Sequence, residues 1–96
     1  MNTPIRPEEK KRILSQALWD LNMTPEEFEG VIRGVIVKDW PTRGFCVARL
    51  LESVNWYDVV KIFSPAELCA VWDEARGYLR SESIRKGMDF ACGLLQ

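Results

Sequence analysis

The chain has 96 residues, of which 47% are hydrophobic and 28% charged, and its 13 basic and 14 acidic side chains leave a net charge of −1. This length supports one domain, spanning residues 1–96, with one modest core, and the balanced charge excludes a broad electrostatic attraction to nucleic acid. No run of about 18 or more apolar residues occurs, so the sequence predicts no membrane span. The N-terminal segment is charged and lacks the apolar core of a secretion signal. We therefore expect a cytoplasmic protein.

The first two helices are predicted from capping residues and helical spacing. The first begins with Pro7 and carries an apolar stripe as far as Leu21, so we expect it to end near Asn22. The second begins with the hydroxyl N-cap Thr24, which is followed by proline at the first helical position and glutamate at the third. Trp40 precedes a proline and therefore breaks the helix. The predicted buried stripe of the second helix consists of Phe28, Val31, Ile32, Val35 and Ile36.

The next two helices follow this break. A third helix is predicted from about Thr42 to Ser53, and it is apolar almost all round. A helix of that kind is typical of the middle of a bundle. A short fourth helix begins at the N-cap Asn55, with the acidic residue Asp58 at its third position.

The second half of the chain repeats the helix-start signal at Ser64, again with proline first and glutamate third. The helix that follows carries inward-facing residues as far as Leu79, and a last helix is predicted from about Ser83 to Leu95. Together these elements predict an all-α fold, a compact bundle of five to six short helices.

The two helix-start signals permit two interpretations of the architecture. Each is followed by a capped helix, a connection and an apolar helix, which is the pattern of a duplicated helical hairpin. The alternative is that any small helical bundle contains such units. We expect the last helix to pack against the third, its counterpart in the proposed duplication. The alternative is that another chain buries part of the last helix.

The three cysteines, Cys46, Cys69 and Cys92, lie in apolar helical segments at an even spacing of 23 residues, for which the sequence offers no physical reason. None forms a C-x-x-C pair, and the chain contains no histidine. A zinc site or an activated catalytic thiol therefore lacks its usual partners, and we expect no metal and no cofactor. The prediction is three buried free thiols that pack as small hydrophobes.

A surplus of apolar surface indicates an interface with a protein partner or with a second copy of the chain. The last helix is apolar on more than one face, and it contributes Phe90 and Leu94 as candidate interface residues. Trp19 lies off the stripe of the first helix, and Trp40 lies in a connection. Aromatic residues of this kind are enriched where interfaces concentrate their binding energy.

Basic residues indicate the alternative, a nucleic-acid-associated regulatory domain. Arg76, Arg80 and Lys86 are the candidate contacts with phosphates. Acidic residues alternate with them, which favours an ordinary solvated face with ion pairs. No phosphate-binding glycine loop or nucleophile motif occurs, so the chain is predicted to be a non-enzymatic protein-interaction domain, adaptor or regulatory, and nucleic acid is the weaker choice of partner.

Overall fold

In a computed structural model that describes residues 5–18 and 20–95, the chain is all-helical, which confirms the predicted fold class. The described residues form seven helices and no strand. They are α1 (Pro7–Ser15), α2 (Pro25–Ile32), α3 (Arg43–Ser53), α4 (Trp56–Ile62), α5 (Pro65–Ala70), α6 (Trp72–Arg76) and α7 (Glu82–Leu95).

The predicted helix starts are confirmed by hydrogen bonds at the caps. The Thr24 hydroxyl accepts from the amide of Glu27 at 3.1 Å. Ser64 and Glu67 satisfy each other reciprocally, because each backbone amide donates to the other residue's side chain, at 3.0 and 3.2 Å. The side chain of Asn55 caps α4 in the same way.

Two predicted helix ends are wrong. The helix α1 ends at Ser15 rather than near Asn22, because the following amides donate to carbonyls three residues back and tighten the chain into turns. The helix α2 ends at Ile32, and Gly34 then takes a φ of 78°, a left-handed conformation that favours glycine. Val35, expected to be buried, is therefore 80% exposed.

The helix predicted to run from Ser64 to Leu79 is divided in two. Val71 lies between α5 and α6 with φ −112° and ψ 7°, outside helical geometry. This break raises the number of helices in the described residues to seven, one more than the upper limit expected. The duplicated hairpin stays a prediction.

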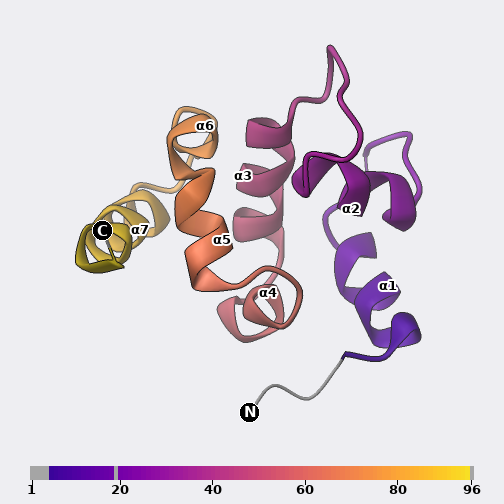
Figure 1. The fold of residues 1–96 in the computed structure, drawn as a ribbon, viewed down its shortest axis with the longest axis horizontal. Coiled ribbons are helices and arrows are strands. Elements are labelled where there is room, and N and C mark those ends of the chain that lie inside the picture. The colour runs from indigo at the N-terminus through magenta and orange to yellow at the C-terminus, as the bar shows by residue number, and fades with distance from the viewer. Residues whose placement is uncertain (1–4, 19, 96) are drawn as a thin grey trace.

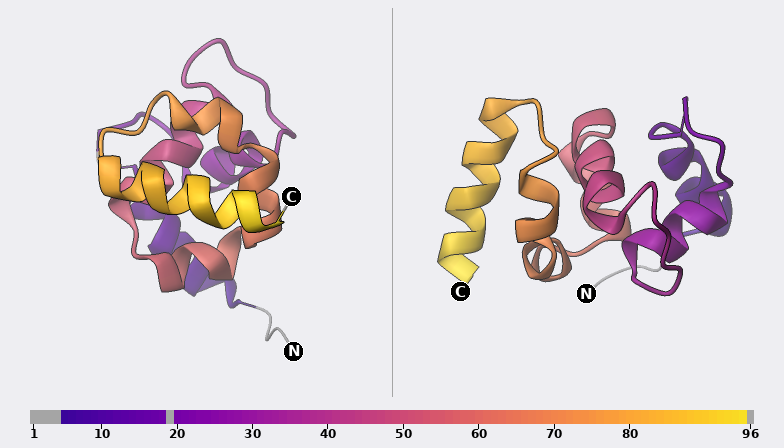
Figure 2. Two further views of the ribbon diagram at one scale, coloured as in Figure 1. Left: turned by 90° about the vertical axis from the view of Figure 1, so that its left-hand side faces the viewer. Right: turned by 90° about the horizontal axis from the view of Figure 1, so that it is seen from above.

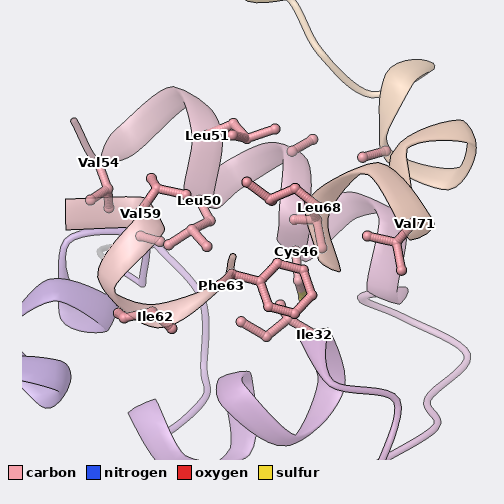
Figure 3. Packing of buried hydrophobic residues seen from close by; sticks show 14 of the residues in the cluster. Ile32, Cys46, Leu50, Leu51, Val54, Val59, Ile62, Phe63, Leu68 and Val71 are labelled. Atoms are coloured by element: carbon pink, nitrogen blue, oxygen red, sulfur yellow. The ribbon is translucent and has the colours of Figure 1, made fainter. Parts of the chain in front are cut away.

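The helices are stacked in layers, with α3 inside (Figures 1 and 2). On one side of α3 lie α1 and α2, and on the other lie α5 and α6, with α7 outermost. The predicted central position of α3 is confirmed, since six of its eleven residues are buried. Figure 3 shows how Cys46 and Leu50 of α3 lie among apolar side chains from α2, α4 and α5.

The last helix packs on α5 and α6, so the expectation that it packs mainly against the third helix is wrong. The break at Val71 and the turn after α6 place α5 and α6 between these two helices. The prediction of three free thiols is also wrong, because Cys69 of α5 and Cys92 of α7 form a disulfide. Only Cys46 is a free thiol, and it is buried as predicted.

Candidate interaction surface

Three aromatic side chains meet near the start of α3 and the end of α6. These two helix ends lie at the same end of the molecule (Figure 1). We call Trp40, Phe45 and Tyr78 the aromatic cluster. The ring centroid of Trp40 lies 4.6 Å from that of Phe45 and 6.1 Å from that of Tyr78, and the Phe45 and Tyr78 rings are 5.8 Å apart. Trp40 is 58% exposed and Tyr78 is 42% exposed. The cluster therefore offers solvent a contiguous aromatic surface held together by ring contacts.

The start of α3 positions this cluster. Thr42 caps the helix by accepting from the amide of Phe45 at 3.3 Å, which fixes the backbone that carries the Phe45 ring. The guanidinium of Arg43 donates to both carboxylate oxygens of Glu74, with the Nε–Oε1 distance at 3.0 Å. This pair ties α3 to α6 and so holds the segment that leads to Tyr78.

Charged groups border the cluster. The Arg49 guanidinium lies 5.5 Å from the centroid of the Phe45 ring, and it pairs with Asp20 at 2.8 Å. Beside them is a pocket of about 260 Å³, to whose lining Arg80 and Glu52 also belong. The Glu52 carboxylate accepts from the backbone amides of Arg80 and Ser81 at 2.6 and 3.0 Å, which fixes the turn before α7.

A second and larger hollow lies between α7 and the corner where α3 ends and α4 begins. Its volume is about 710 Å³, a size typical of ligand pockets. Its lining is mainly apolar. The apolar side chains include Leu51, Val54, Trp56, Ile84, Met88 and Ala91. We call this hollow the α7 groove.

The two predicted interface residues whose side chains the structure describes, Trp40 and Phe90, lie on different elements. Trp40 joins the aromatic cluster, whereas Phe90 lies on α7 with 70% of its surface exposed. Within the described part of the chain, Phe90 makes no ring contact with the cluster. Trp19 and the side chain of Leu94 lie outside the described residues.

The candidate nucleic-acid contacts are for the most part engaged in ion pairs. Arg76 donates to both carboxylate oxygens of Asp89, and Lys86 pairs with Glu82 at 3.1 Å. Asp89 also accepts from the indole of Trp72 at 2.7 Å. The Arg76 and Trp72 hydrogen bonds hold the pKa of Asp89 below its usual value, so this carboxylate stays charged beside Arg76.

The described residues contain no group of three or more histidine, cysteine or acidic side chains placed to hold a metal ion. Burial raises the pKa of the Cys46 thiol to about 11, which keeps this thiol protonated and unreactive at neutral pH. None of the helices in the described ranges is both long and apolar enough to cross a membrane.

Sequence reasoning identified only one member of the aromatic cluster. Trp40 was found because it lies in a connection, where a large aromatic has little reason to be buried. Phe45 is one of many apolar residues in the third predicted helix and does not stand out among them, and Tyr78 carries no local signal because its neighbours come from a distant part of the sequence. Comparison with known proteins gives no family model, no curated protein and no solved structure that matches this chain.

Proposed function

We propose that this chain is a non-enzymatic protein-interaction domain that binds its partner through the aromatic cluster. The observation that carries the proposal is the joint exposure of Trp40 and Tyr78 on rings that are already in contact. Aromatic side chains held in place before binding lose little conformational entropy when a partner covers them, so they supply binding energy efficiently. Charged groups at the border, such as Arg49 and Glu52, resemble the polar rim of an interface.

The nucleic-acid alternative receives less support. Arg76 and Lys86 each face an acidic partner, so binding to a phosphate would have to break an ion pair. Charge reversal at Arg76 and Arg80 tests this alternative directly, because it should abolish any retention of nucleic acid if these residues contact phosphates.

The main proposal is tested by site-specific photo-crosslinking in living cells. A photoreactive phenylalanine analogue is placed at Trp40, and at Tyr57 as a matched control, since Tyr57 is an exposed aromatic (80%) that lies on α4 outside the cluster. We expect a discrete crosslinked product from position 40 and none from position 57. Its mass shows whether the partner is a second copy of the chain or another protein. Equal products from both positions, or none, would contradict the proposal.

Self-association is measured separately by light scattering over a dilution series. Trp40→Ala should weaken any dimer that uses the cluster, whereas Phe90→Asp should weaken one that uses the outer face of α7. Both side chains are largely exposed, so neither change should unfold the protein. A dimer lost only with Phe90→Asp would move the interface to α7 and overturn the assignment to the cluster.

A further inference from the structure

The described side chains of the outermost helix, α7, join it to the rest of the fold by few buried contacts and one disulfide bond. Of its side chains that the structure describes, only Met88 and Cys92 are buried. Cys92 is bonded to Cys69 of α5, with the two Cα atoms 5.3 Å apart. The remaining ties are polar or partly exposed. They include the hydrogen bonds that the Asp89 carboxylate accepts from the Trp72 indole and the Arg76 guanidinium.

We propose that the Cys69–Cys92 disulfide is a reducible latch, and that exchange with a dithiol releases α7 from α5 while the other helices stay folded. Outer elements that bury few side chains open at lower free energy than the core. α5 lies between α7 and α3, whereas α7 is outermost and its main contacts are with α5 and α6 alone. We therefore expect α7 to be the element whose order depends most on this bond. Most of the buried side chains belong to α1–α6, so we expect these helices to stay folded when the bond is reduced.

The difference in exposure between the two cysteines sets the course of the exchange. Cys69 is only partly buried, whereas Cys92 is 3% exposed. A thiolate of the dithiol attacks Sγ of Cys69, forms a mixed disulfide with it and displaces the thiolate of Cys92. The second thiol of the reductant then attacks the reductant's own sulfur and displaces Cys69. Two electrons and two protons pass to the cysteine pair, and the dithiol leaves as a disulfide.

Opening the latch would also reshape the α7 groove. Ile84, Met88 and Ala91 of α7 form one wall of this groove, and Leu51 and Trp56 lie on the opposite side. Displacement of α7 separates these walls and exposes their apolar surface. Because Trp40, Phe45 and Tyr78 all lie outside α7, the latch can be tested independently of the aromatic cluster.

The test compares amide hydrogen exchange in the oxidised and the dithiol-reduced full chain. On reduction without denaturant we expect exchange in residues 84–93 to accelerate by about tenfold or more, while α2 and α3 keep their protection. Alkylation followed by mass spectrometry confirms the redox state. Cys46 should react slowly because it is buried. Cys69→Ser under oxidising conditions should reproduce the exchange pattern of the reduced protein, and Cys46→Ala, which retains the disulfide, should not.

Three results would overturn the latch. The first is a disulfide that the dithiol does not reduce in the folded protein. The second is unchanged exchange in α7 after complete reduction. The third is loss of protection in all helices together, which would mean that the bond stabilises the whole fold. If Cys69→Ser does not fold, the reduced wild-type protein still decides between these outcomes.

Discussion

A Cβ atom on Gly44 would overlap the backbone carbonyl of Glu74. The helices α3 and α6 therefore touch through their backbones at this point, with no side chain between them. The same contact brings Arg43 within reach of the Glu74 carboxylate and leads the chain on to Tyr78. The aromatic cluster thus depends on a glycine that is not itself part of it.

Gly44→Ala should destabilise the fold, because the obstacle is backbone and cannot rotate away. We expect a loss of about 1–3 kcal/mol in the free energy of unfolding, the range for overpacking, even though alanine is the better helix former. Gly87→Ala is the matched control, since a Cβ atom at Gly87 would meet nothing within 4 Å. That change should stabilise the protein by up to about 1 kcal/mol. Urea denaturation measures the change in the free energy of unfolding for each variant. Equal effects of the two substitutions would show that the close backbone approach of α3 and α6 does not constrain these helices.

Arg33 joins α2 to the junction of α4 and α5. Its guanidinium donates to the carbonyl of Ile62 at 2.6 Å, pairs with Glu29 and Glu67, and lies 5.6 Å from the ring centroid of Phe63. Arg33→Ala should lower the free energy of unfolding by about 1–2 kcal/mol. Arg33→Lys should recover less than half of the loss, because an ammonium group cannot reproduce the planar fork.

The control for Arg33 is Arg12→Ala, which removes an exposed cation from α1 and should change stability by less than about 0.5 kcal/mol. Denaturation midpoints of the three variants are compared at one salt concentration. If Arg33→Ala behaves like Arg12→Ala, the contacts of Arg33 contribute nothing measurable.

The sequence predicts helix starts well because their chemistry is local. Thr24, Asn55 and Ser64 each cap an amide three residues ahead, so the signal and the structure occupy the same short segment. Helix ends are harder to predict from the sequence. Val35 continues the apolar spacing of α2, but Gly34 turns the chain away, and the break at Val71 has neither proline nor glycine to mark it.

The candidate site is less predictable than the fold, because it depends on contacts between distant segments. Phe45 and Tyr78 meet only once α3 and α6 have docked at Gly44. The disulfide was missed for the same reason. The even spacing of Cys46, Cys69 and Cys92 does not select a pair, whereas the packing of α7 on α5 places Cys69 and Cys92 together and leaves Cys46 in the core.

Asp89 should contribute to stability in a pH-dependent way. Its folded pKa is lowered from the usual 3.8 by the hydrogen bond from Arg76 and then by that from Trp72. The unfolded state therefore binds the proton more readily, so the contribution is present above about pH 4 and is lost as the pH falls below that value. Asp89→Asn should reduce the loss of stability between about pH 5 and pH 3 relative to the wild type.

Urea denaturation over this pH range checks the prediction for Asp89. Asp39→Asn, which removes an exposed carboxylate from the connection before α3, serves as the control for the loss of an acid. If the stability of Asp89→Asn falls with pH as steeply as that of the wild type, the ion pair with Arg76 does not contribute to folding.

Cys46 should produce the opposite dependence at alkaline pH. Burial raises its pKa from 9.0 to about 11, so above pH 9 the unfolded state releases the thiol proton while the folded state keeps it. Stability then falls as the pH rises from 9 towards 11, by at most about 1.4 kcal/mol per pH unit from this group. Cys46→Ala removes this contribution to the fall of stability with rising pH, although the cavity that it leaves lowers the free energy of unfolding equally at every pH. The measurement is urea unfolding of the oxidised protein at pH 8, 9 and 10, followed by tryptophan fluorescence, with the Cys69–Cys92 pairing verified by mass spectrometry. A constant difference between wild type and variant at all three pH values would show that Cys46 titrates alike in the folded and unfolded states.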